Sequence, residues 1–128
     1  MKVYKFGGAS VKDANAVRNL YSLIKDENSE LIVVVSAMGK TTNRLEYIWE
    51  KCISQKQKNA IHELDKLSLF HSEIINNLNL SQDEKLDVKL KSYVNELKDI
   101  IKNYKNENHA FIHDQIVSFG ELFSTTII

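Results

Sequence analysis

The chain has 128 residues, which is the size of one ordinary domain and is long enough to bury a core. Its 17 lysine and arginine residues balance 17 aspartate and glutamate residues, so no net charge attracts it to nucleic acid or to an anionic membrane, and we expect neither as a partner. A single cysteine, the lack of a signal-peptide pattern and the lack of a long apolar run favour a cytoplasmic protein.

Residues 1–35 have the pattern of a strand, a helix and a second strand. Residues 2–6 bring valine and aromatic side chains into alternation and stop at a pair of glycines, which predicts a short strand. Ser10, with Asp13 three residues later, forms a capping-box pattern that predicts the start of a helix. The apolar stripe of this helix is expected to consist of Ala14, Val17, Tyr21 and Ile24.

The next segment is a continuous apolar run. Residues 31–35 are almost all β-branched, which is typical of a strand buried on both faces. A strand, a helix and a buried strand in this order indicate a parallel sheet with a right-handed crossover. The order of elements therefore predicts an α/β fold.

From Asn43 onward the apolar residues recur at helical spacing. Three helices are expected, and a capping box at residues 81–84 starts the third. Their apolar faces comprise Leu45, Ile48, Trp49 and Cys52 in the first helix, Ala60, Leu64, Leu67, His71, Ile74 and Leu78 in the second, and Leu86, Leu90, Tyr93, Leu97, Ile100 and Tyr104 in the third. Together they predict a helical insert over about residues 43–106.

The last segment, residues 111–128, begins a further helix around Ile116, Val117 and Phe123. It ends in an apolar stretch with no helix stop signal. Two parallel strands also make a poor sheet alone, because such strands need covered faces and neighbours on each side. We therefore expect the chain to be part of a larger domain.

The first candidate site segment runs from Lys5 to Ser10, at the end of the first strand. In parallel α/β folds, ligands bind beyond the carboxyl ends of the strands. The glycines Gly7 and Gly8 let backbone N–H groups face a phosphate, and a lysine neutralises phosphate oxygens. The spacing fits an ordinary strand-to-helix turn equally well, with Lys5 exposed to solvent.

The second candidate segment, residues 36–43, follows the second strand. It is not a Walker A motif, because that motif needs a glycine where Val34 stands. Its hydroxyls, including those of Ser36 and Thr42, can bind a carboxylate or a phosphate. Helix capping by Thr41, Thr42 or Asn43 is the alternative, and it explains one of these residues but not all three.

The third candidate segment, residues 118–125, places Gly120 and Glu121 in an otherwise apolar helix. Glycine inside a helix costs about 1 kcal/mol relative to alanine, so we expect another part of the chain to come close there. Glu121 has apolar neighbours, and a partly buried carboxylate requires a cationic partner. A lysine of the protein or the ammonium group of a substrate would serve.

The histidines predict no metal site. His109 and His113 stand four residues apart, but no carboxylate or cysteine completes a plausible set of ligands. His71 falls on an apolar stripe, where a hydrogen-bonded core histidine is expected.

Taken together, the three candidate segments resemble motifs of aspartate kinases in the amino-acid-kinase family. The opening K-F-G-G-[TS]-S of that family corresponds to residues 5–10, with Ala9 where a threonine is common. Its S-A and T-N pairs correspond to residues 36–37 and 42–43, and its S-x-G-E-x-x-S-T to residues 118–125. The resemblance implies part of a three-layer αβα sandwich with a mainly parallel sheet, of the carbamate-kinase-like type, carrying a helical insert.

The resemblance also implies an activity: transfer of the γ-phosphoryl group of ATP, accompanied by Mg²⁺, to the side-chain carboxylate of L-aspartate. That reaction is the first step toward lysine, threonine and methionine. The implied roles are phosphate binding by Lys5, Gly7, Gly8 and Ser10, with Lys5 also catalytic, and aspartate binding by Ser36, Thr42 and Glu121. Such chemistry depends on positioning two anionic reactants and cancelling their charge.

Members of the family continue through a second half of the kinase domain and, usually, ACT domains. Residues 1–128 are therefore expected to be the N-terminal portion of a catalytic domain, inactive or nearly so alone, in an enzyme that is a homo-oligomer at full length. One alternative is a related kinase acting on acetylglutamate, glutamate, carbamate or UMP. Another is a non-catalytic fragment that serves as an oligomerising or binding module.

Overall fold

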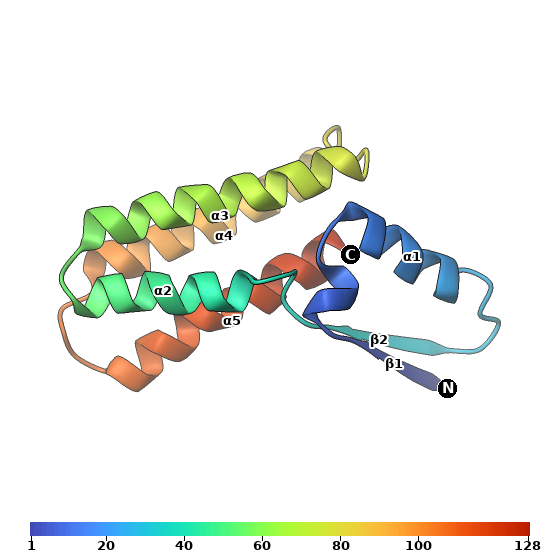
Figure 1. Ribbon diagram of the computed structural model, residues 1–128, viewed down its shortest axis with the longest axis horizontal. Coiled ribbons are helices and arrows are strands. Elements are labelled where there is room, and N and C mark those ends of the chain that lie inside the picture. The colour runs from blue at the N-terminus through green and yellow to red at the C-terminus, as the bar shows by residue number, and fades with distance from the viewer.

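The computed structural model describes all residues from 1 to 128. The elements in chain order are β1 (Lys2–Phe6), the short 3₁₀ helix η1 (Gly8–Val11), α1 (Ala14–Ile24), β2 (Leu31–Val35), α2 (Thr41–Ile53), α3 (Gln57–Asn77), α4 (Glu84–Asn103) and α5 (His109–Ile127). The strands and α1 gather at one end of the molecule, α2, α3 and α4 extend away from them, and α5 runs back toward the strands (Figure 1). No helix has both the length and the apolar character needed to cross a membrane.

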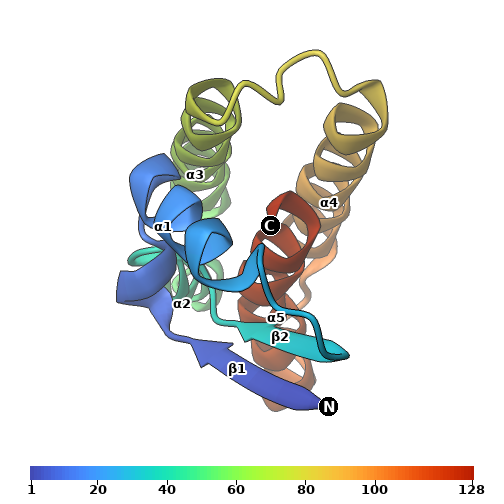
Figure 2. The same cartoon turned by 90° about the vertical axis from the view of Figure 1, so that its right-hand side faces the viewer.

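The two strands pair in parallel, with Lys2 opposite Leu31 and Phe6 opposite Val35. This confirms the predicted parallel pairing around a helical crossover. Figure 2 shows the strands side by side with α1 and the C-terminal end of α5 nearby. A mainly apolar cavity is lined by side chains of α1, β2 and the end of α5, including Val17, Val33 and Ile127, so these helices cover one face of the sheet.

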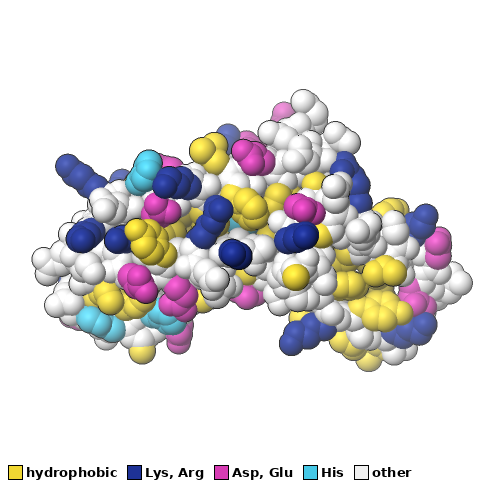
Figure 3. All heavy atoms as spheres, viewed as in Figure 1, with side chains coloured by type: hydrophobic (Ala, Val, Ile, Leu, Met, Phe, Trp, Pro, Cys, Tyr) yellow, Lys and Arg dark blue, Asp and Glu magenta, His cyan; other side chains and the backbone are white.

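The other face of the sheet is exposed. Val3, Ile32 and Val34 lie on it with 61%, 47% and 43% of their surface accessible, and Lys5 stands beside Val34 in the strand register. Apolar side chains reach the surface around the strands (Figure 3). The prediction that residues 31–35 are buried on both faces is therefore wrong, because no helix of the chain covers the second face of the sheet. The α/β class is confirmed, while the three-layer sandwich is not seen.

The starts of two helices differ from the sequence prediction. Asp13, not Ser10, caps α1: its carboxylate accepts the Ala16 N–H at 2.8 Å, and Ser10 lies within η1. In α4 the cap is Asp83, whose carboxylate accepts the Leu86 N–H at 3.0 Å. In both cases an aspartate sits directly before the first helical residue, where its oxygen reaches the free N–H groups.

Helices α2 to α5 pack together through the apolar faces that the sequence predicts. The predicted residues that are buried include Leu45, Ile48, Trp49 and Cys52 of α2, Ala60, Leu64, Leu67, His71 and Ile74 of α3, Leu86, Leu90 and Leu97 of α4, and Ile116 and Phe123 of α5. In α4 the structure buries Ile101, whereas the predicted Ile100 is only half-buried. The stripe of α1 was predicted less well, because Leu20 is buried and Tyr21 is 63% exposed. No strand follows these helices, since residues 109–127 form α5.

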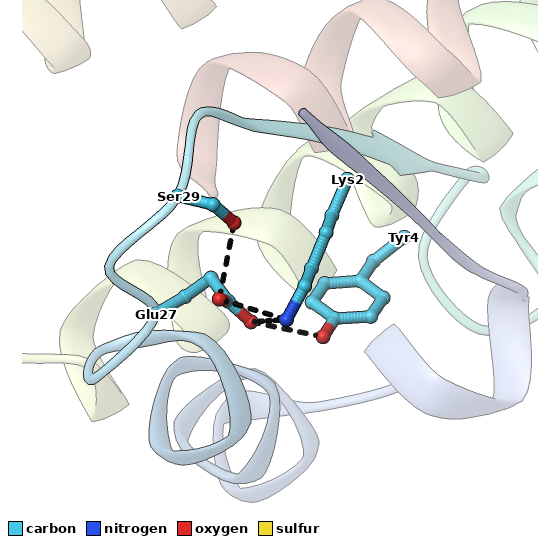
Figure 4. A network of polar contacts seen from close by, with 4 residues as sticks. All are labelled: Lys2, Tyr4, Glu27 and Ser29. Atoms are coloured by element: carbon cyan, nitrogen blue, oxygen red, sulfur yellow. Dashed lines mark hydrogen bonds and ion pairs between the residues drawn. The ribbon is translucent and has the colours of Figure 1, made fainter.

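A polar network holds the start of β1 against the connection between α1 and β2 (Figure 4). Lys2 Nζ lies 3.0 Å from one oxygen of Glu27, and Tyr4 Oη donates to the other at 3.1 Å. Ser29 Oγ also donates to Glu27. The hydrogen bond from Lys2 is the main reason that the pKa of Glu27 lies below its usual range. The connection is thereby tied to the strand that carries the first candidate loop.

Candidate functional site

The two loops that follow β1 and β2 lie side by side, because the carboxyl ends of two paired parallel strands meet at the same edge of the sheet. Ser36 N donates to Phe6 O at 3.0 Å, and Gly39 N donates to Gly8 O at 3.2 Å. A Cβ atom on Gly8 would stand only 3.0 Å from Gly39 O and 3.1 Å from Ala37 O. The second loop thus comes so close to the Gly8 backbone that a side chain at position 8 would crowd it.

The first loop leaves polar groups free at the end of β1. The backbone N–H groups of Gly7, Gly8 and Ala9 donate no hydrogen bond within the chain, and nothing lies within 4 Å of the place where a Cβ of Gly7 would stand. Lys5 is exposed and belongs to no ion pair. Ser10 is exposed as well, and its N–H donates to Gly7 O. Three free donors and one free cation suit an anionic ligand.

A hydrogen bond between Thr41 and Met38 stabilises the second loop. Thr41 is fully buried, and its hydroxyl donates to Met38 O at 2.6 Å. Lys40 occupies the cap position of α2 without a side-chain hydrogen bond, so capping does not account for the polar residues that follow it. Ser36 and Thr42 are half-buried, and neither hydroxyl has a partner in the chain. These two hydroxyls therefore remain available to a ligand.

Helix α5 packs directly against the second loop. A Cβ on Gly120 would lie 2.8 Å from Ala37 Cβ, which confirms the predicted close approach at this glycine. Ser124 is fully buried, and its hydroxyl donates to Ser36 O at 2.6 Å. Sequence reasoning assigned no role to Ser124; the signal was a hydroxyl one helical turn from Gly120 on the same face.

Glu121 differs from its prediction. It lies between the two contacts that α5 makes with the second loop, but it is exposed and forms no ion pair with a lysine of the chain. The expected partial burial is wrong because the buried face of α5 carries Gly120, Phe123 and Ser124, and Glu121 points off that face. Its carboxylate is thus unpaired in this structure.

The predicted site residues do not form one enclosed pocket. Of the five main cavities, one of about 470 Å³ is lined by Ser10 together with η1 and α1 residues, and none is lined by Lys5, Ser36, Thr42 or Glu121. The two loops and α5 therefore present a surface rather than a closed cleft. No group of three histidine, cysteine, aspartate or glutamate side chains is arranged to hold a metal ion.

The histidines have separate partners. His109 Nε2 lies 2.9 Å from Tyr104 Oη, and His113 Nε2 lies 2.8 Å from Glu46 Oε2. The hydrogen bond to Glu46 raises the pKa of His113. His71 is buried as predicted, but only its Nδ1 is hydrogen-bonded, to Leu67 O at 2.9 Å, and its Nε2 has no partner. Burial lowers the pKa of His71.

Comparison with known protein families gives one match over the whole chain. The family model described as the amino acid kinase family matches residues 1–128. Among curated proteins, aspartokinase 1, chloroplastic, of Arabidopsis thaliana is 35% identical over 130 residues, which cover 98% of this chain and 22% of that protein. The bifunctional aspartokinase/homoserine dehydrogenase of Buchnera aphidicola is 31% identical over 137 residues, covering 100% of this chain and 16% of that protein.

A solved structure of Clostridium acetobutylicum aspartate kinase shares the fold. It superposes with a TM-score of 0.70 at 24% sequence identity, over 98% of this chain and 28% of that chain. The chain spans about a fifth of the length of the curated relatives it matches.

Proposed function

The chain belongs to the amino acid kinase family, and from that premise we propose that it is the N-terminal part of the catalytic domain of an aspartate kinase. The parent enzyme would transfer the γ-phosphoryl group of ATP to the side-chain carboxylate of L-aspartate, giving 4-phospho-L-aspartate, the first step toward lysine, threonine and methionine. Relatives that bear the name aspartokinase over almost the full chain support this choice within the family.

The observation that carries the proposal is the meeting of three segments at one end of the sheet. The loop after β2 contacts the loop after β1 at Gly8 and contacts residues 120–124 of α5 at Ser36 and Ala37. Each segment brings unpaired polar groups to this place. A surface with free N–H donors, a free lysine and a free carboxylate can bind a phosphate and an amino acid next to each other.

The phosphate side of the proposed site is the first loop. The free N–H groups of Gly7 and Gly8 would donate hydrogen bonds to phosphate oxygens, with Ser10 adding a hydroxyl. Lys5 would stabilise the negative charge on the phosphoryl group during transfer, because that charge is spread over its outer oxygens in the transition state. Lys5 suits this role since no carboxylate of the chain neutralises it.

The aspartate side is the second loop with α5. Thr42 would donate to a carboxylate of the substrate, Ser36 would lie near the reacting groups, and Glu121 would pair with the α-ammonium group. An exposed, unpaired Glu121 is free to form this ion pair. Mg²⁺ would arrive bound to the ATP phosphates.

We further propose that the parent enzyme is a cytoplasmic homo-oligomer and that residues beyond this chain complete the nucleotide pocket. The chain occupies about a fifth of its relatives, and the residues with proposed roles form an open surface. Residues 1–128 alone should therefore turn over little or no ATP.

The test uses the full-length parent protein and measures ATP turnover with L-aspartate, N-acetylglutamate, glutamate, carbamate or UMP as acceptor. Turnover only with aspartate supports the proposal, and turnover with another acceptor or with none contradicts it. Lys5→Ala should lower kcat by about 10²–10³-fold, the loss typical of removing one transition-state donor. Lys25→Ala, an exposed lysine at the far end of α1, is the control and should leave kcat unchanged.

The aspartate side has a matched test in the same protein. Glu121→Gln should raise the KM for aspartate by roughly 10–100-fold, corresponding to ~1.5–3 kcal/mol for a charge-assisted hydrogen bond. Glu96→Gln, an exposed glutamate on α4 without an ion pair, should not change it. An unchanged KM in Glu121→Gln would remove Glu121 from the substrate site while leaving the role of Lys5 intact.

A further inference from the structure

Ser124 uses its hydroxyl differently from Ser118 and Thr125, two other hydroxyl residues of α5. A serine or threonine inside a helix usually donates to a carbonyl of the preceding turn. Ser118 donates to Gln115 O at 2.8 Å, and Thr125 donates to Glu121 O at 2.8 Å. Ser124 instead donates to Ser36 O at 2.6 Å, across 88 residues of sequence, from a fully buried position.

The peptide group that Ser124 contacts lies between the two sides of the proposed site. Ser36 N donates to Phe6 O at the end of β1, so Ser36 is held by β1 through its N–H and by α5 through its carbonyl. Ser36 also carries one of the two free hydroxyls of the second loop. A change in the Ser124 bond would therefore move a residue next to the reacting groups.

The same part of α5 contacts the next residue of the loop. Gly120, one turn before Ser124, packs on Ala37, and Ala37 O approaches Gly8 so closely that a Cβ there would stand 3.1 Å away. A continuous series of contacts thus leads from α5 through residues 36–37 to Gly8, in the loop with the free N–H groups. Glu121 lies between Gly120 and Ser124 on this helix.

We propose that Ser124 is a positioning residue: by holding the Ser36 carbonyl, it sets the distance between Glu121 on α5 and the phosphate-side loop at Gly8. This inference rests on the proposed function for its catalytic consequence, but the effect on the loop is independent of it. Ser124 touches no substrate. Its hydroxyl fixes the backbone of the second loop, and the free Ser36 and Thr42 hydroxyls take their places from that backbone.

The first measurement is amide hydrogen exchange in the ligand-free full-length protein. Ser124→Ala should speed exchange at Ser36 and Gly39, whose N–H groups donate to Phe6 O and Gly8 O. Ser118→Ala is the matched control on the same helix, because its hydroxyl bonds only within α5, and it should leave both amides unchanged. Equal exchange in the two variants would overturn the positioning role, whatever reaction the protein catalyses.

The second measurement is steady-state kinetics with aspartate as the varied substrate. Ser124→Ala should lower kcat/KM for aspartate by about 10–100-fold, since small misplacements of reacting groups cause losses of this size. Ser124→Thr, which keeps the hydroxyl, should recover most of it. If Ser124→Ala unfolds, Ser124→Cys, with a weaker donor of similar size, should give an intermediate loss.

The two measurements separate the possible failures. Faster loop exchange in a parent protein that shows no aspartate-dependent turnover would sustain the positioning of the loop and refute the proposed function. Wild-type kinetics in a folded Ser124→Ala variant would refute the positioning role and leave the proposed function standing.

Discussion

Gly120 and Ala37 approach one another more closely than two residues with full side chains could. A methyl group on Gly120 would stand 2.8 Å from Ala37 Cβ and 3.4 Å from Leu45 Cδ1. Gly120→Ala should therefore lower the free energy of unfolding by about 1–3 kcal/mol, the usual loss for overpacking a core. Chemical denaturation measures the change.

A second substitution tests whether the clash is the cause. Ala37→Gly removes the atom that the new methyl group would meet, so Gly120→Ala with Ala37→Gly should be more stable than the sum of the single changes predicts. Gly7→Ala is the control, since nothing lies within 4 Å of a Cβ at that position, and it should change stability little. Strictly additive effects in the double variant would show that Gly120 is needed for another reason.

His71 links stability to pH. Its buried ring is neutral in the folded state, because its pKa is lowered, chiefly by burial, while the unfolded chain titrates near the usual value of about 6.5. As the pH falls below about 6.5, the unfolded state binds a proton that the folded state resists, and the free energy of unfolding decreases. His71→Leu should flatten this decrease, as measured by denaturation between pH 7 and pH 5.

His113 provides a comparison of opposite sign. Its pKa is raised, mainly by the hydrogen bond with Glu46, so its contribution is fully present below about pH 6.5 and is lost as the pH rises through its folded value. His113→Gln should therefore remove stability at low pH, where His71→Leu adds it. If both variants shifted the pH dependence in the same direction, the assignment of His71 as the acid-sensitive group would be wrong.

Individual site residues were predictable to different degrees. The glycines and Lys5 could be placed from the sequence because a strand end followed by glycines fixes where the backbone is free. The exposure of Glu121 could not, since apolar neighbours in sequence do not say which side of a helix faces the core. The role of Ser124 was also hidden, because its partner lies 88 residues away.

At the scale of elements, the start of α1 distinguishes two capping residues that the sequence offers together. Asp13 accepts the Ala16 N–H, and Ser10 has no such contact. Asp13→Ala should lower the free energy of unfolding by about 0.5–2 kcal/mol, whereas Ser10→Ala should leave it nearly unchanged. Thermal or chemical denaturation of the two variants checks this. A larger loss from Ser10→Ala would mean that η1, not the Asp13 cap, stabilises this turn.

The helices were the most predictable elements, and their boundaries the least. Long stripes at helical spacing in α2, α3 and α4 identified almost every buried residue, because many apolar side chains must share one face. In α1, whether Leu20 or Tyr21 is buried depends on a small rotation of the helix about its axis, and the sequence pattern alone does not fix that rotation. The capping pattern at Ser10 failed because a 3₁₀ turn intervenes before the α-helix, and propensity does not distinguish the two.

At the scale of the whole molecule, the parallel pairing was predictable and the burial of the sheet was not. The order strand, helix, strand sets the pairing, since such a connection returns the chain in the same direction. Burial of both faces of the sheet requires a second layer of helices. The apolar side chains of Ile32 and Val34 suit contact with such a layer. Ile32, Val34 and Val3 form an exposed apolar face, and a longer relative contains further residues that are available to cover such a face.

The bond between Ser124 and Ser36 also bears on how the protein folds. It joins residues separated by 88 positions, whereas α2, α3 and α4 pack against neighbours in the chain. Closing so long a loop carries an entropic penalty that local helix pairing does not, so contacts of low sequence separation are favoured to form early. The amides of α3, which packs against its chain neighbours α2 and α4, should become protected from exchange before the amides of the second loop. The surface proposed to bind the substrates would then be among the last parts of the chain to form.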